Sequence, residues 1–197
     1  MIRCVRLGRA VAAAGFVALL AACAAPAPIQ APPGAETREA LSRVGRFALR
    51  VEEAGGKQHA VQGGFAWRDD GSRLALDLVS PLGATLARVE AGPGEAVLRE
   101  SNGRETRAGD PDALVGIVLG NDIPVSGLRD WLRGRVAPRV AANVARRDEL
   151  GRPLVFEQAG WHVTAQQYDA LGPTRLHMAR QEGGQEVDLR LVISPDP

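Results

Sequence analysis

The chain is poor in the residues that most catalytic and metal-binding sites require. It has two cysteines, Cys4 and Cys23, among 197 residues, and its three histidines lie far apart in the sequence. No group of Cys, His, Asp and Glu has the spacing of a metal site, and no GxSxG, Walker A or GxGxxG motif is present. These absences argue against an enzyme, and neither a metal nor a cofactor is expected.

Net charge is also small. Lys57 is the only lysine, and 24 basic residues are balanced by 23 acidic ones. Residues 1–22 contain three of the arginines (Arg3, Arg6 and Arg9) and no acidic residue. The rest of the chain therefore has 21 basic and 23 acidic residues, which give a net charge of −2. Such a balance gives no electrostatic basis for binding nucleic acid or a strongly anionic lipid surface.

No apolar run is long enough to remain in a bilayer as a spanning helix. The stretch 10–22 is apolar, follows the three arginines and ends in Leu-Ala-Ala directly before Cys23. This is the pattern of a bacterial lipoprotein signal, although an ordinary secretory signal with a chance cysteine is the alternative. We therefore expect residues 1–22 to be a signal peptide, 23–35 to be a lipidated N-terminus with a Pro/Ala linker, and 36–197 to be one domain.

Alternation of apolar and polar residues dominates the domain after a short helix predicted for residues 36–43. Glycine- and aspartate-containing turns separate the alternating runs, as in antiparallel hairpins. The pattern predicts about eleven strands, which we place at residues 47–51, 61–67, 74–78, 84–91, 95–100, 104–107, 139–147, 153–158, 161–168, 174–181 and 186–193.

Two short helices are predicted between the sixth and seventh strands. Asp110 is expected to cap the first, with Pro111 at its first position, and Ser126 is expected to cap the second, which ends at Gly134. Strands on both sides of a helical insertion predict an α+β fold, in which a strongly curved antiparallel sheet forms an incomplete barrel covered by short helices. Composition alone leaves open whether the apolar interior is a filled core or a cavity.

One loop does not fit a purely structural explanation. Ser80-Pro81-Leu82-Gly83 separates two predicted strands, yet its tip is a leucine where a polar residue is expected. An isolated surface leucine is common, but a leucine held at the tip of a tight loop can also enter a bilayer. Its burial would contribute about 2 kcal/mol, which is too little to anchor a protein.

The order and spacing of several short motifs resemble the LolB family of outer-membrane lipoprotein receptors. The motifs are Gly45-Arg46-Phe47, Phe65-Ala66-Trp67, residues 78–83 (LVSPLG), Ile123-Pro124, residues 128–134 (LRDWLRG) and Gly160-Trp161.

The resemblance implies an incomplete barrel that encloses an apolar cavity for acyl chains. It also implies that Leu82 acts in membrane insertion and that Cys23 carries lipid. The residues expected to line the cavity are Phe47, Leu49, Phe65, Trp67, Leu76, Leu78, Trp131, Trp161, Leu176, Met178, Leu189 and Leu191.

The resemblance further implies a monomeric protein, lipid-anchored on the periplasmic face of the outer membrane. It would accept acylated lipoproteins from the periplasmic carrier LolA and insert them into that membrane. Arg46 and the face formed by Arg129 and Arg133 are candidates for contact with the carrier. The rival hypothesis is a periplasmic sensor or assembly lipoprotein that binds a protein partner on a solid curved sheet.

Overall fold

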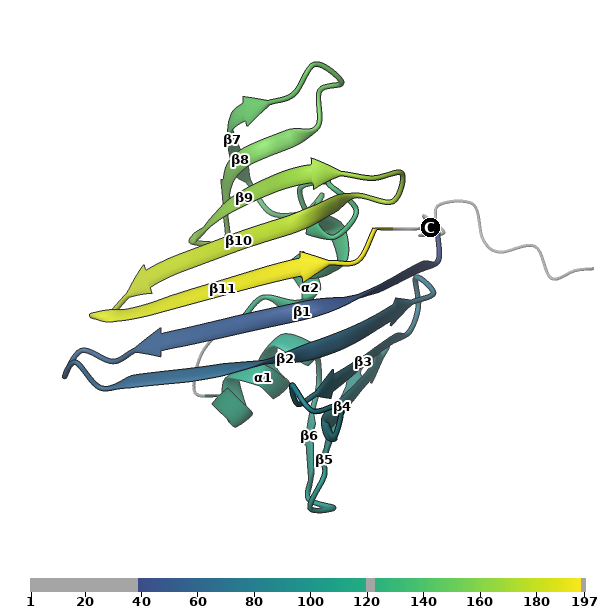
Figure 1. The fold of residues 1–197 in the computed structure, drawn as a ribbon, viewed down its shortest axis with the longest axis vertical. Coiled ribbons are helices and arrows are strands. Elements are labelled where there is room, and N and C mark those ends of the chain that lie inside the picture. The colour runs from purple at the N-terminus through teal and green to yellow at the C-terminus, as the bar shows by residue number, and fades with distance from the viewer. Residues whose placement is uncertain (1–38, 120–122, 196–197) are drawn as a thin grey trace, which may run out of the picture. The chain divides into compact units, whose positions relative to one another are not determined.

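Antiparallel strands dominate the structure, a computed structural model that describes residues 39–119 and 123–195 (Figure 1). Within those residues, eleven strands form one sheet in the order β6-β5-β4-β3-β2-β1-β11-β10-β9-β8-β7. The strands are β1 (Leu41–Glu52), β2 (Gln58–Asp69), β3 (Leu74–Val79), β4 (Thr85–Gly92), β5 (Glu95–Glu100), β6 (Glu105–Ala108), β7 (Ala142–Arg147), β8 (Pro153–Gln158), β9 (Trp161–Tyr168), β10 (Pro173–Glu182) and β11 (Gln185–Ile193).

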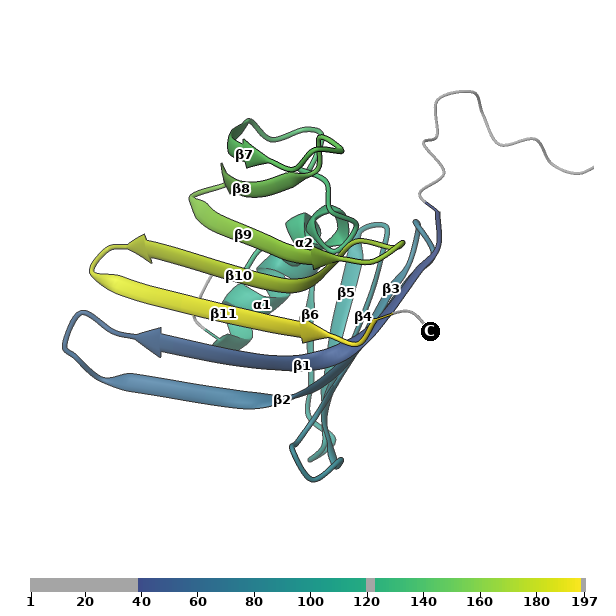
Figure 2. The same cartoon turned by 45° about the horizontal axis from the view of Figure 1, so that its top comes forward.

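The two helices, α1 (Pro111–Leu119) and α2 (Val125–Trp131), lie on the concave side of the curved sheet (Figures 1 and 2). The first and last strands, β1 and β11, pair with each other, so the sheet is continuous from β6 to β7. All these elements belong to one compact unit, Thr37–Pro197. The predicted fold class, an α+β protein with a curved antiparallel sheet and short helices, is confirmed.

Alternation along the strands decides which side chains enter the interior. In β11, Val187, Leu189, Leu191 and Ile193 are buried, while the residues between them are partly or fully exposed. The period of two places every second residue on the same face. The register of β1 against β11 then aligns Phe47 with Leu191 on that inner face.

A glycine allows the backbones of β2 and β3 to approach each other closely. A Cβ atom at Gly63 would lie only 2.1 Å from the carbonyl oxygen of Val79. No side chain fits at that distance, so only glycine permits this close approach of the two backbones.

Two expectations about local structure are wrong. Residues 41–43, assigned to a helix, begin β1, because they pair with Asp69, Arg68 and Trp67 of β2 and this pairing outweighs their helical propensity. Ser126 does not cap α2: the helix begins at Val125, and the Ser126 amide donates to the Asp112 carboxylate at 2.8 Å. The Asp110 cap is confirmed, since its carboxylate accepts from the Ala113 amide at 2.8 Å.

A fully satisfied glutamine holds the segment between α2 and β7 against the sheet. The Gln158 side-chain oxygen accepts from the Trp131 indole and from the Ala137 amide, both at 2.8 Å. Its amide group donates to the carbonyls of Ala137 and Val140 at 2.9 and 2.8 Å. Gln158 is 2% exposed, so these four bonds replace those it would make with water.

We expect Gln158→Leu to lower the free energy of unfolding by about 2–4 kcal/mol, because the Trp131 indole and the buried backbone groups would lose their partners. Urea unfolding followed by circular dichroism measures the change. Gln62→Leu, at an exposed position of β2, is the matched control and should change the free energy of unfolding little. Equal stability of the two variants would contradict a structural role for the Gln158 hydrogen bonds.

Candidate acyl-binding site

An apolar pocket lies between the sheet and the two helices. Its volume is about 370 Å³, at the lower end of the range of about 300–1,000 Å³ that is typical of small-molecule sites. Strands β1 to β5 and β11 form one wall, and α1, α2 and their flanking residues form the other. The lining is aliphatic and aromatic except at one end, where Glu100, Ser101 and Asn102 contribute.

Most of the residues predicted for the cavity lie on the sheet side of this pocket. They come from strands that pair directly, so the register brings them onto one surface; Phe65, for example, pairs with Leu78, and Leu49 with Leu189. The predicted residues that line the pocket are Phe47, Leu49, Phe65, Trp67, Leu76, Leu78, Leu189 and Leu191.

The remaining four predicted residues lie elsewhere, in a filled core under β8–β10. Trp131 packs its ring edge-on against Phe156, with centroids 5.8 Å apart, and Trp161, Leu176 and Met178 are 1–2% exposed. None of the four lines the pocket. Large side chains fill this half of the concave face, whereas the half under β1–β5 is hollow.

The helical wall of the pocket was missed by sequence reasoning. It consists of residues before, within and after the two helices, namely Leu114, Val115, Ile123, Val125, Leu128 and Leu132. The spacing of 125, 128 and 132 is that of one helical face, which was the available signal. The sequence alone could not show that this face meets a space rather than other side chains.

A buried carboxylate fastens α2 to the sheet. The Asp69 side chain is fully buried, and it accepts from Arg129 Nε and Arg133 Nη1, both at 3.0 Å, and from the Gly71 amide at 2.9 Å. Arg129 also donates to the carbonyl of Gly71, and Arg133 to that of Glu39. Both arginines are candidates for carrier contact, which stays a prediction; in the structure both pair with Asp69.

Opposing effects act on the titration of Asp69. Burial of the carboxyl group favours its neutral form, but the hydrogen bonds from Arg129 and the Gly71 amide, and the charge of Arg129, outweigh burial and lower the pKa of Asp69. The carboxylate is therefore charged at neutral pH and holds both arginines. This contact fixes the position of the pocket wall that α2 provides.

The loop at Leu82 is tightly closed. Ser80 Oγ accepts from the Ala84 amide at 3.1 Å, the Ser80 carbonyl accepts from the Gly83 amide at 2.9 Å, and the Ser80 amide donates to the Ala84 carbonyl at 2.7 Å. Gly83 has φ +87°, which glycine adopts without strain. Proline second and glycine fourth is the order favoured in type I turns. Leu82, at the third position, is 98% exposed.

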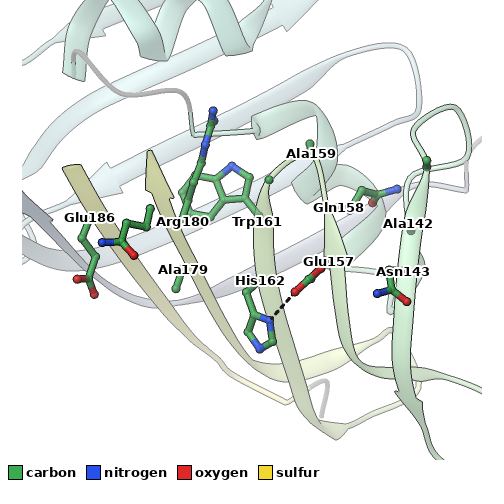
Figure 3. A pocket seen from close by; sticks show the side chains of 13 residues that line it. Ala142, Asn143, Glu157, Gln158, Ala159, Trp161, His162, Ala179, Arg180 and Glu186 are labelled. Atoms are coloured by element: carbon green, nitrogen blue, oxygen red, sulfur yellow. Dashed lines mark ion pairs between the residues drawn. The ribbon is translucent and has the colours of Figure 1, made fainter. Parts of the chain in front are cut away.

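A second, larger hollow of about 800 Å³ lies at the β7–β11 end of the sheet (Figure 3). Small and polar residues form its lining, among them Ala142, Asn143 and Gln158. Trp161 and Arg180 project to one side of the strands, while His162 and Glu157, with His162 Nδ1 3.8 Å from Glu157 Oε1, project to the other (Figure 3). This mixed lining does not suit a hydrocarbon chain.

Within 39–119 and 123–195, no three His, Cys, Asp or Glu side chains gather as metal ligands would. Over the same residues, neither helix is long and apolar enough to cross a membrane. Arg46 is exposed on the outer face of β1, and its contact with a carrier stays a prediction. Cys23 and the expected signal and linker segments lie outside the described residues.

Comparison with known proteins identifies relatives along most of the chain. A family model described as outer membrane lipoprotein LolB matches residues 40–195. The outer-membrane lipoprotein LolB of Bordetella petrii is 50% identical over 182 residues, covering 92% of this chain and 90% of the relative. That of Bordetella pertussis is 51% identical over 179 residues, covering 91% and 88%. That of Cupriavidus metallidurans is 39% identical, covering 90% of each.

Among solved structures, a LolA superfamily protein from Nitrosomonas europaea aligns over 79% of this chain and 86% of its own, with 9% identity and a TM-score of 0.42. That similarity is too low to support an argument. The family model and the relatives at about 50% identity confirm the resemblance seen in the sequence, and the chain belongs to the outer-membrane lipoprotein LolB family.

Proposed function

We propose that this protein is a lipid-anchored receptor on the periplasmic face of the outer membrane, which accepts lipoproteins from a periplasmic carrier and inserts them into that membrane. The observation that carries the proposal is the apolar pocket between sheet and helices, in a chain of this family. The anchor would be an acyl group on Cys23, after removal of residues 1–22. The carrier would be LolA, and the receptor would act as a monomer.

Acyl chains explain why such a pocket is needed. Exposing one methylene group to water costs about 0.8 kcal/mol, so a lipoprotein with long acyl chains cannot cross an aqueous compartment unprotected. A pocket lined by leucine, phenylalanine and tryptophan side chains replaces that water. The binding is non-directional and needs no covalent chemistry, so we propose a binding and transfer protein rather than an enzyme.

The direction of transfer would follow from affinities. Each acceptor must hold acyl chains more strongly than the donor before it, and the bilayer must hold them most strongly. The pocket volume of about 370 Å³ favours partial rather than complete enclosure of cargo with several chains. Such cargo requires the helical wall to move. We infer that this movement leaves α2 in place, since the Asp69 contacts hold it.

Binding of a fluorescent fatty acid to the chain that begins at residue 23, with Cys23→Ser, tests the pocket. We expect saturable binding that Leu49→Glu weakens by about 2 kcal/mol, or about 30-fold in Kd, because a charge would replace an apolar part of the wall. Ala48→Glu is the matched control, since Ala48 is its neighbour in β1 and faces outward.

Transfer of an acylated lipoprotein from LolA, followed by co-elution, tests the function itself. A complex is expected with the acylated lipoprotein and not with its non-acylated form. The proposal would be refuted if no saturable fatty-acid binding occurred and the acylated and non-acylated lipoproteins behaved alike. That outcome would favour a lipoprotein that binds a protein partner on its sheet.

A further inference from the structure

The pocket is closed at one end and open at the other. At the closed end, Leu114 and Leu132 are 0% exposed and Trp67 is 2% exposed. At the open end, Val61 and Leu86 line the pocket and yet are 48% and 37% exposed. A ligand that enters from this end passes these two side chains, which we call the mouth of the pocket.

The loop that carries Leu82 lies at this same end. Leu86 lies three residues after Gly83, the last residue of that loop. Its carbonyl accepts from the Ser101 amide at 3.0 Å, which joins β4 to the turn between β5 and β6. Ala87 pairs with Glu100 in the adjoining strands. The turns after β3 and after β5 accordingly lie together at the lower edge of the sheet in Figure 2.

Polarity changes along the pocket in the same direction as exposure. The lining has a carboxylate, a hydroxyl and an amide side chain at Glu100, Ser101 and Asn102; Glu100 ends β5, and the other two follow it in the turn beside the mouth. A methyl end can lie against apolar side chains without cost, whereas a carbonyl or ester group needs a hydrogen-bonding partner or water. The mouth end of the lining offers the Ser101 hydroxyl and the Asn102 side-chain amide together with access to water, whereas the indole nitrogen of Trp67, at the other end, is buried.

From this polarity we propose that acyl chains enter and leave through the mouth between Val61, Leu86 and the 100–104 turn. The methyl end lies against Leu114 and Leu132, and the ester end lies beside Ser101 and Asn102. The acyl chain then leaves the pocket next to Leu82, so the residue expected to enter the bilayer lies beside the exit. This inference rests on the proposed function, because it assumes that the pocket binds acyl chains.

Orientation can be measured with two spin-labelled stearic acids, one with its nitroxide near the carboxyl group and the other with it near the methyl end. A fluorophore is attached to a cysteine introduced by Ala84→Cys, an exposed position in the turn beside the mouth that does not line the pocket, in the Cys23→Ser chain that begins at residue 23 and has no other thiol. We expect stronger quenching by the carboxyl-end nitroxide. A fluorophore attached at Leu150→Cys, in the exposed β7–β8 turn, should be quenched equally by the two probes.

The route can be tested by obstruction. A bulky maleimide on Leu86→Cys should slow loading and release of a fluorescent fatty acid several-fold each, and the same adduct on Leu150→Cys should change neither rate. The inference would be overturned if the two nitroxides quenched the fluorophore equally or in the reverse order, or if the adduct at position 86 left the loading and release rates unchanged. Either result, with saturable binding, would leave the proposed function standing. Absence of any saturable binding would overturn both.

Discussion

Release of lipoprotein into liposomes should fall by about 30-fold in Leu82→Glu, while acceptance from the carrier is retained. The side chain is 98% exposed at the tip of a closed turn, so the protein itself buries none of its apolar surface. Entry of a leucine into a bilayer contributes about 2 kcal/mol, and its loss from the transition state for insertion corresponds to about 30-fold in rate. A carboxylate adds a desolvation cost in the same step.

The measurement follows a fluorescently labelled lipoprotein from a preloaded receptor into liposomes. Leu150→Glu is the control, because Leu150 is also an exposed leucine in a hairpin turn, 76% exposed, but at the opposite edge of the sheet. Leu82→Phe should retain release, since an apolar side chain of similar size can enter the bilayer. If release by Leu82→Glu equals that of the unaltered protein, Leu82 has no part in insertion.

Asp69→Asn should lower the free energy of unfolding by about 3 kcal/mol, because it leaves two arginines near the interior without their counter-charge. In a domain of this size, the loss corresponds to a Tm lower by about 6–12 °C. Glu105→Gln is the matched control. Glu105 also lies between two arginines, Arg99 and Arg107, but all three side chains are exposed, so the change should stay below about 1 kcal/mol.

The same carboxylate predicts a dependence of stability on pH. Its pKa is lower in the folded protein than the value of about 3.9 of an unperturbed Asp, so its contribution is present at neutral pH and is lost as the pH falls through the folded-state pKa. Urea unfolding between pH 7 and the acid range should show a steeper loss for the unaltered protein than for Asp69→Asn. Parallel curves would show that Asp69 does not contribute.

Alternation along the chain was enough to predict the strands. The eleven strands agree with the predicted ranges to within a few residues at most ends, because the period of two is a local property that each strand carries itself. The first strand is an exception: residues 41–43 extend β1 through pairing with β2, a partner that local sequence does not reveal. Likewise, the Asp110 cap is local and was predicted, whereas Val125 begins α2 through packing.

Asp69 shows where prediction from local pattern ends. Its place beside Asp70 and Gly71 correctly indicated a hairpin turn between β2 and β3. Its partners, Arg129 and Arg133, lie 60 and 64 residues further along the chain. Their meeting depends on how α2 crosses the concave face, and no spacing in the sequence encodes it.

The sequence by itself determined the strand and helix segments, the family and the tight turn that exposes Leu82, since each depends on residues close together in the chain or on motifs in a fixed order. Only the tertiary structure decided which apolar residues line a pocket and which fill a core. Alternation assigns a side chain to a face, but packing depends on what lies opposite that face. Beneath Trp161 and Met178 the space is filled by neighbouring side chains, and beneath Phe65 and Leu78 it stays open under the helices.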